Sequence, residues 1–284
     1  MHMIARRQTL ADLLHRSACR VPTKTAIVCG DTRWSYAEFD RVCDRVAAGL
    51  SELGVAKGDR VAVLARNSHG FAAMRFALAR IGAVLVPINF MLKAEEVAYI
   101  LRHAGARMLA TDSGLAELAR AAAARDTAVS AFIWLPSEEP SAPAENMVTF
   151  DSLAASTAQL PAVELASDDL AQIVYTSGTE ALPKGAMLTH DAVIWQYVSC
   201  VVDAGIASDD LALHALPLYH RAAARAGFAQ LIFGAEHRRQ RRDLGLAVQV
   251  PQAHAGQPRR QLAQHLHRHD RRAVVALAQA RQIG

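Results

Sequence analysis

One segment near the middle of the chain determines the fold predicted around it: Tyr175-Thr176-Ser177-Gly178-Thr179-Glu180-Ala181-Leu182-Pro183-Lys184-Gly185. The residues before it, 171–175, form a short apolar run that is rich in β-forming side chains. Residues 187–191 have the composition of the start of a helix. We therefore predict that the segment is a loop between a buried strand and a helix.

The loop carries the groups that phosphate binding needs. It offers glycines that allow close backbone approach, three hydroxyl side chains and one cation: Gly178, Gly185, Thr176, Ser177, Thr179 and Lys184. Backbone N–H groups in such a turn form a concavity for anions. The alternative is a solvated turn that binds nothing. The loop does not match the GxxxxGK[ST] pattern, because Pro183 precedes Lys184 and Gly185 takes the hydroxyl position, which argues against a nucleoside triphosphatase of that type.

Strands and helices alternate along the first three quarters of the chain. Hydrophobic periodicity and capping signals predict helices at 9–20, 35–54, 67–81, 93–103, 115–125 and 191–202, and strands at 25–29, 58–64, 82–89, 106–111, 128–135, 171–175 and 211–216. Ser35 and Glu38 have the spacing of a capping box. This alternation predicts an α/β fold built from βαβ units with a mostly parallel sheet.

The loop sequence as a whole resembles the phosphate-loop signature of the adenylate-forming (AMP-binding) superfamily, whose usual form is T-S-G-T-T-G-x-P-K-G. Glu180 and Ala181 are the two departures from it. Three further stretches, at 32–38, 58–62 and 82–89, resemble landmarks of the same family in the same order. The Pro-Leu-Tyr-His sequence at 217–220 resembles its acyl-pocket motif, so the resemblance covers roughly residues 8–220.

The resemblance implies a function and a set of site residues. It implies an acid–CoA ligase (AMP-forming), with fatty acyl-CoA synthetases as the most similar members. ATP, Mg²⁺ and coenzyme A would be the cofactor and co-substrates, and a small carboxylic acid would be the substrate. The residues implied to hold the phosphates are Thr176, Ser177, Gly178, Thr179, Glu180, Pro183, Lys184 and Gly185. The role implied for His220 is to line the acyl pocket and help to place the carboxylate.

We divide the chain at residue 220. Residues 1–220 are predicted to be part of the large N-terminal AMP-binding domain, incomplete, with a polar linker at 136–167 before the phosphate loop. Residues 221–284 contain twelve Arg, no Lys and three acidic residues, and are rich in Ala, His and Gln. This tail is either a basic segment for nucleic acid or an acidic membrane, a diverged helical end, or an out-of-frame translation of GC-rich DNA. We favour the last, because shifted GC-rich codons yield mainly these residue types.

Several features of the family are not found in the printed sequence. We find no aromatic-Gly-x-Thr-Glu segment to hold Mg²⁺, no later Asp for the ribose and no small C-terminal domain with its catalytic Lys. We therefore expect a truncated ligase with little or no activity. The alternative is a non-catalytic nucleotide-binding or interaction module with a basic tail. Nucleic acid is not an expected partner, because the tail has only Phe228 and Phe233 for stacking.

Cysteine use and hydropathy suit a cytoplasmic protein. The four cysteines are scattered without a CxxC pair, which favours reduced thiols over disulfides or a zinc site. No residues are assigned to a metal. No apolar run approaches the roughly 20 residues that span a bilayer, and the N-terminus lacks the apolar core of a signal peptide.

Overall fold

A computed structural model describes residues 8–137, 142–176, 182–204, 206, 211–214, 217–220 and 236–238. Its helices are α1 (Leu10–Arg20), α2 (Tyr36–Glu52), α3 (His69–Arg80), α4 (Ala94–Ala104), α5 (Ala116–Ala123), α6 (Phe150–Ala154), α7 (His190–Ala204) and the 3-10 turn η1 (Ser113–Leu115). Its strands are β1 (Thr25–Cys29), β2 (Thr32–Ser35), β3 (Arg60–Leu64), β4 (Val84–Pro87), β5 (Met108–Thr111), β6 (Ala131–Trp134), β7 (Met147–Thr149), β8 (Leu170–Thr176), β9 (Lys184–Thr189), β10 (Leu211–Leu213) and β11 (Glu236–Arg238).

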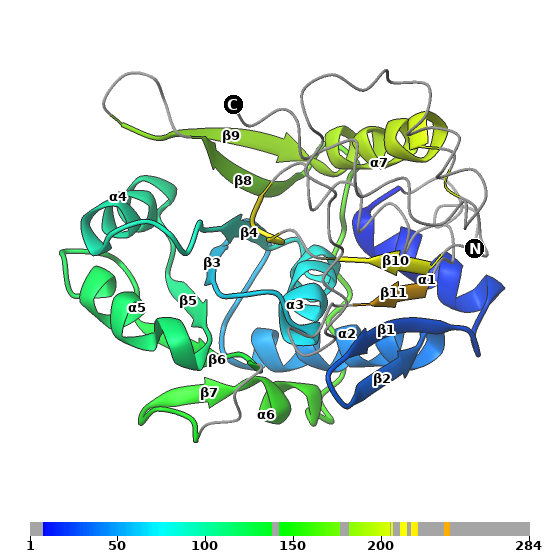
Figure 1. Ribbon diagram of the computed structural model, residues 1–284, viewed down its shortest axis with the longest axis horizontal. Coiled ribbons are helices and arrows are strands. Elements are labelled where there is room, and N and C mark those ends of the chain that lie inside the picture. The colour runs from blue at the N-terminus through cyan, green and yellow to red at the C-terminus, as the bar shows by residue number, and fades with distance from the viewer. Residues whose placement is uncertain are drawn as a thin grey trace, which may run out of the picture. The chain divides into compact units, whose positions relative to one another are not determined.

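Seven of these strands form one mainly parallel sheet in the order β7-β6-β5-β3-β4-β8-β9 (Figure 1). All neighbouring pairs among strands β3 to β8 are parallel, and only β9 runs antiparallel to its neighbour β8. The prediction of an α/β fold with a parallel sheet is confirmed.

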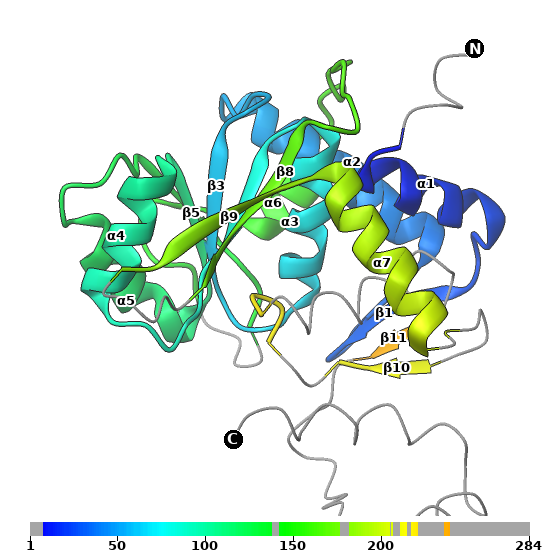
Figure 2. The ribbon, with the colours of Figure 1, turned by 90° about the horizontal axis from the view of Figure 1, so that it is seen from above.

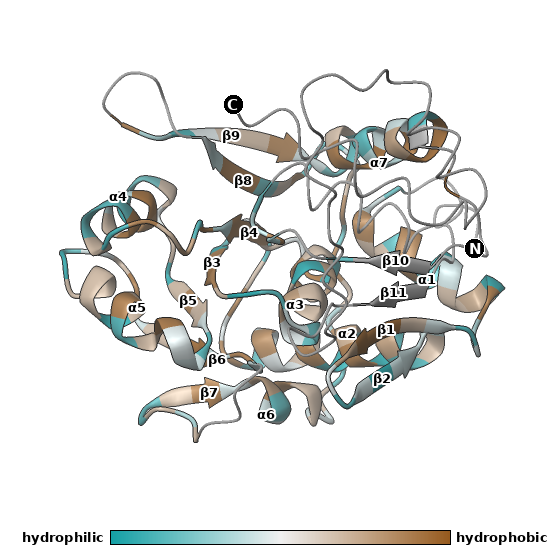
Figure 3. Ribbon diagram, in the orientation of Figure 1, coloured by the Kyte–Doolittle hydropathy of each residue, from teal (hydrophilic) through white to brown (hydrophobic). Residues whose placement is uncertain are grey.

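Helices cover both faces of this sheet, with α2 and α3 on one side and α4 and α5 on the other (Figures 1 and 2). The side chains of β3 point alternately to these two layers of helices. Val61 and Val63 belong to the core that includes α2 and α3, whereas Ala62 and Leu64 belong to the core that includes α4 and α5. Because both faces are covered, the central strands β3 and β4 are almost wholly apolar rather than alternating, as their brown colour in Figure 3 shows.

A second sheet has the order β10-β11-β1-β2. Strand β1 is antiparallel to β2 and parallel to β11, with Ile27 opposite His237. Residues 236–238 of the predicted tail are thus strand residues in this sheet. The other tail residues lie outside the described part of the chain, so the boundary at 220 and the out-of-frame origin stay predictions.

The predicted capping box of the second helix is confirmed. The Ser35 hydroxyl accepts a hydrogen bond from the Glu38 N–H, and the Glu38 carboxylate accepts one from the Ser35 N–H at 2.7 Å. The hydrogen bonds that the Ser35 N–H and the Ser35 hydroxyl donate to this carboxylate lower the pKa of Glu38. A second box, between Thr9 and Asp12, opens α1. Local sequence thus fixes where both helices begin.

The linker prediction is wrong for residues 147–154. Strand β7 adds to the sheet beside β6, and α6 packs on α2, where a Cβ on Gly49 would lie 3.1 Å from the Leu153 Cα. Phe150 and Leu153 are buried in the core. A strand of three residues and a helix of five are too short to show a hydrophobic period, so the sequence pattern did not reveal them.

The prediction of a helix directly after the loop is also wrong. Residues 187–189 belong to β9, which pairs with β8 from Leu170 opposite Thr189 to Thr176 opposite Lys184. The helix begins at His190, one residue before the predicted helix at 191–202. The His190 N–H donates to the Asp169 carbonyl, and the His190 Nδ1 accepts from the Leu10 N–H at 3.3 Å, which ties α7 to α1.

His214, directly after β10, gives the protein an acid-sensitive group. Burial lowers the pKa of His214 from 6.5 to about 4. The unfolded chain therefore takes up this proton at higher pH than the folded chain, so stability falls as the pH drops from 6.5 towards 4. We expect His214 to remove about 2 kcal/mol of unfolding free energy between pH 7.5 and 5.

Urea denaturation of wild type and His214→Asn at pH 7.5 and pH 5 measures this loss of unfolding free energy. The variant should lose about 2 kcal/mol less than wild type on acidification, whatever its stability at pH 7.5. Equal acid losses in the two proteins would show that His214 does not titrate in this way.

Candidate functional site

The predicted phosphate loop is the turn of the β8–β9 hairpin. Its two ends are fixed side by side because Thr176 lies opposite Lys184 in the last pair of the ladder. Both residues are exposed, and Leu182 within the turn is 55% exposed. The remaining predicted phosphate ligands Ser177, Gly178, Thr179 and Glu180 lie outside the described residues.

Gly185 is a packing position of this hairpin. Pro183 and Lys184 precede it, and Tyr175 lies opposite it on β8. A Cβ at Gly185 would lie 2.9 Å from the Ile173 Cγ2 and 3.1 Å from the Tyr175 ring carbon Cζ. Any side chain here would push on two residues of β8, so the glycine lets the strands approach just before the turn.

A Tyr–His–Tyr group supports the hairpin from α4. The Tyr175 hydroxyl and the His103 Nδ1 are 2.7 Å apart, and the His103 ring stacks on Tyr99 at 5.5 Å between centroids. Burial, and then the neighbouring Tyr99, raise the pKa of Tyr175 to about 12, so this hydroxyl keeps its proton at neutral pH. The sequence analysis missed His103, which lies 72 positions before Tyr175 and has no local signal for this role.

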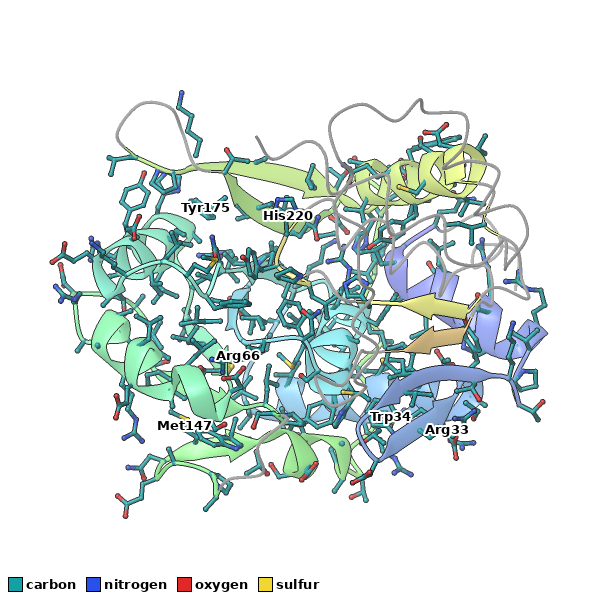
Figure 4. The ribbon with its side chains drawn as sticks, viewed as in Figure 1. Arg33, Trp34, Arg66, Met147, Tyr175 and His220 are labelled. Atoms are coloured by element: carbon teal, nitrogen blue, oxygen red, sulfur yellow. The ribbon has the colours of Figure 1, made fainter. Side chains whose placement is uncertain are left out.

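The segment Pro217–His220 is held at the ends of two strands of the large sheet. The Leu218 N–H donates to the Asn67 Oδ1 at 2.7 Å, and Asn67 follows β3. The Tyr219 ring meets Phe90, which follows β4, edge-on at 5.0 Å. The His220 N–H donates to the Pro217 carbonyl at 3.0 Å, and its side chain is exposed. Figure 4 labels His220 in this segment and Tyr175 on β8.

These contacts bring the loop and the His220 segment to one edge of the sheet. Strands β3, β4 and β8 are parallel, so their carboxyl ends meet at the same edge. The phosphate loop leaves the carboxyl end of β8, and the His220 segment contacts the residues just beyond β3 and β4. Open α/β sheets bind their ligands outside the carboxyl ends of the strands. Thr176 and Lys184 of the hairpin and the segment that carries His220 thus lie at the same, carboxyl edge of the sheet.

A charged pair lies at the same edge, after β3 and β5. Asp112 accepts a hydrogen bond from the Arg66 N–H at 2.7 Å, and the Arg66 guanidinium lies 3.6 Å from its other oxygen. Asp112 is buried, whereas the Arg66 side chain is 49% exposed. A Cβ at Gly114 would lie 2.0 Å from the Arg66 Nη1, so a side chain there would displace the guanidinium from this position. The sequence analysis did not single out this pair, which joins residues 46 positions apart.

The described residues contain no cluster of three or more His, Cys, Asp or Glu side chains suited to a metal ion. This part of the chain therefore provides no cluster of protein ligands for the implied Mg²⁺. Within the same part of the chain, no helix is both long and apolar enough to cross a bilayer.

Comparison with known proteins shows the family of this chain. The model of the AMP-binding enzyme family matches residues 14–243. A feruloyl-CoA synthase of Amycolatopsis sp is 37% identical over 218 residues, which are 77% of this chain and 41% of that protein. A long-chain-fatty-acid–CoA ligase of Mycobacterium tuberculosis is 36% identical over 197 residues, 68% of this chain and 37% of that protein.

A solved structure shows the same architecture. The N-terminal domain of FACL13 from Mycobacterium tuberculosis superposes with a TM-score of 0.71 at 30% identity, covering 82% of this chain and 57% of that one. The chain thus spans about two fifths of the curated relatives that it matches. Because the family model matches most of its length, the chain belongs to the family of AMP-binding enzymes.

Proposed function

We propose that this chain carries the ATP-binding part of an acid–CoA ligase (AMP-forming). In such a reaction a carboxylate attacks the α-phosphorus of ATP, which gives an acyl-adenylate and releases pyrophosphate. The thiol of coenzyme A then attacks the acyl carbon, which gives the acyl-CoA and releases AMP. Family membership and the two curated relatives, both CoA-thioester-forming by name, support this proposal.

The observation that carries the proposal is that two elements lie at the same edge of the sheet. The hairpin turn, with its exposed lysine and hydroxyl, leaves the carboxyl end of β8, and the His220 segment contacts the residues beyond β3 and β4. A loop that binds phosphate, at the same edge as a histidine-bearing segment, would suit a reaction between a triphosphate and a carboxylate. Positioning and charge neutralisation supply most of the catalysis in such a reaction.

Each residue has a definite task in this proposal. Lys184 neutralises the β- and γ-phosphates and the departing pyrophosphate, and the Thr176 hydroxyl donates to a phosphate oxygen. Ser177, Gly178, Thr179 and Glu180 belong to the same loop and complete the phosphate-binding turn. His220 helps to place the carboxylate. Mg²⁺, bound with ATP, would offset further negative charge.

The proposed substrate is a fatty acid, and the proposed compartment is the cytoplasm. The long-chain-fatty-acid–CoA ligase supports this class, whereas the feruloyl-CoA synthase makes an aromatic acid the competing choice. We also propose that turnover by the 284-residue chain is low, because its sequence contains no aromatic-Gly-x-Thr-Glu segment.

ATP–pyrophosphate exchange tests the reaction. The purified chain is incubated with ATP, Mg²⁺, labelled pyrophosphate and either a fatty-acid series or ferulate, with Lys184→Ala as the blank. We expect exchange close to the blank, together with an ATP-dependent rise in melting temperature. Clear exchange with one acid would overturn the low-turnover proposal and identify the substrate. The absence of both exchange and stabilisation would overturn the ATP-binding proposal itself.

The second candidate is a non-catalytic nucleotide-binding or interaction module. The same missing segment favours it, because nucleotide binding by the loop does not require the whole ligase. Stabilisation by the non-cleavable analogue α,β-methylene-ATP as strong as that by ATP, unchanged by any acid and without exchange for any acid, would favour this module.

A further inference from the structure

Three side chains on α1 and α2 form a Cys–His–Asp chain far in sequence from the phosphate loop. The Cys19 Sγ lies 3.6 Å from the His15 Nε2, and the His15 Nδ1 lies 2.9 Å from the Asp40 Oδ2. Cys19 and His15 are exposed, whereas Asp40 is buried and paired with Arg80 of α3. The sequence analysis gave none of these residues a role.

The order of these contacts is that of an activated thiol. A nucleophile within reach of an imidazole, whose other nitrogen is oriented by a carboxylate, is the general arrangement for nucleophilic activation. His15 and Cys19 are four positions apart on α1, which places them on one helix face. Asp40 is itself held by Arg80, so the carboxylate that orients His15 has a fixed position.

We propose that Cys19 is a modification site, a reactive thiol that forms a mixed disulfide with a small-molecule disulfide, with His15 as its base. In this step His15 takes the Cys19 proton and the thiolate attacks one sulfur of the incoming disulfide. A new bond joins Cys19 to that sulfur, and the incoming S–S bond breaks. The second sulfur leaves as a thiolate and takes the proton back from His15. The Cys19 thiol is oxidised and half of the incoming disulfide is reduced, so no other oxidant is needed.

The surroundings of Cys19 favour an incoming anion. Arg16 and Arg20 flank it on α1 and are exposed. His15 is the base in contact with Cys19, so it is the discriminating residue.

The other cysteines provide internal references in the same molecule. Cys43 is fully buried, and burial raises the pKa of its thiol, so it should be inert in the folded protein. Cys29 and Cys200 are partly exposed. An ordinary thiol is only a few per cent thiolate at neutral pH, which sets the reactivity expected without a base.

The experiment measures the rate of mixed-disulfide formation at each cysteine of the folded, full-length chain. The probes are oxidised glutathione, followed by peptide mass spectrometry, and 5,5′-dithiobis(2-nitrobenzoate), followed by absorbance. We expect Cys19 to react at least tenfold faster than Cys29 or Cys200 at pH 7.5. Cys19→Ser should remove the fast phase, and Cys200→Ser should leave it unchanged.

His15 variants decide the mechanism. His15→Gln and His15→Ala should slow Cys19 by about tenfold or more, as removal of an adjacent base does, and leave the rates of Cys29 and Cys200 unchanged. Iodoacetamide, which needs the thiolate but no proton for its leaving group, should show the same slowing. The melting temperature should stay near that of wild type, because His15 is exposed. A Cys19 rate within twofold of wild type in both variants, or a Cys19 no faster than Cys200, overturns the proposal.

Discussion

Lys184→Ala should abolish the stabilisation that ATP gives to this protein. The lysine provides the positive charge at the end of the hairpin turn, and a charge-assisted hydrogen bond contributes about 1.5–3 kcal/mol. Its loss should weaken ATP binding roughly 10- to 150-fold. At ATP equal to ten times the wild-type Kd, the stabilisation of about 1.4 kcal/mol should fall below about 0.4 kcal/mol. Thermal denaturation with and without ATP measures this difference.

Two variants control this experiment. Lys93→Ala removes an exposed lysine at the start of α4 and should keep the full ATP effect. Lys184→Arg keeps the charge and should retain part of it. Because Lys184 is exposed, its removal should leave the melting temperature without ATP unchanged. A Lys184→Ala protein that ATP stabilises as strongly as wild type would show that the loop is not the nucleotide site.

Arg80→Met should produce the largest loss of stability among the charged side chains considered. Arg80 is 9% exposed and pairs with Asp40 and, at 2.6 Å, with Asp44. Burial on its own would lower the pKa of Arg80, but Cys43, Asp40 and Asp44 raise it. Removing the cation takes the arginine partner from the buried Asp40 carboxylate, and breaking a buried ion pair in this way typically costs about 3–5 kcal/mol. Since Asp44 is 41% exposed, we expect the lower end, about 3 kcal/mol, by urea denaturation.

The matched control is Arg45→Met on the same helix α2, where the side chain is exposed. Its effect should stay within about 0.5 kcal/mol. Adding Asp40→Asn to Arg80→Met should recover part of the loss, because it removes the buried charge left behind. A loss below about 1 kcal/mol in Arg80→Met would mean that water solvates these carboxylates.

Local signals in the sequence identified much of the fold, and long-range contacts account for what it did not identify. The Ser35–Glu38 box and the apolar strands β3 and β4 were predictable, because both depend on neighbouring residues or on burial of whole strands. The pairing of β9 with β8 could not be predicted, because residues 187–189 carry no alternating pattern that distinguishes a strand from the start of a helix.

The residues of the candidate site also differ in whether the sequence could identify them. The motif resemblance singled out Lys184 and His220, and the structure places both at the carboxyl edge of the sheet. The contacts of Tyr175 with His103, and of Arg66 with Asp112, join residues 72 and 46 positions apart. Side chains that meet only after folding leave no spacing pattern in the chain, so a single sequence could not reveal these pairs.

The parallel pairing of β1 with β11 has a consequence for synthesis of the protein. Ile27 and His237 lie opposite each other although 210 positions separate them. At a translation rate of about 5–20 residues per second, β1 leaves the ribosome roughly 10 to 40 s before its partner. During that interval the β1 edge has unpaired N–H and C=O groups that can accept a strand from another nascent chain. Slower translation between these two strands lengthens that exposure, so we expect aggregation during expression to increase when rare codons are placed between them.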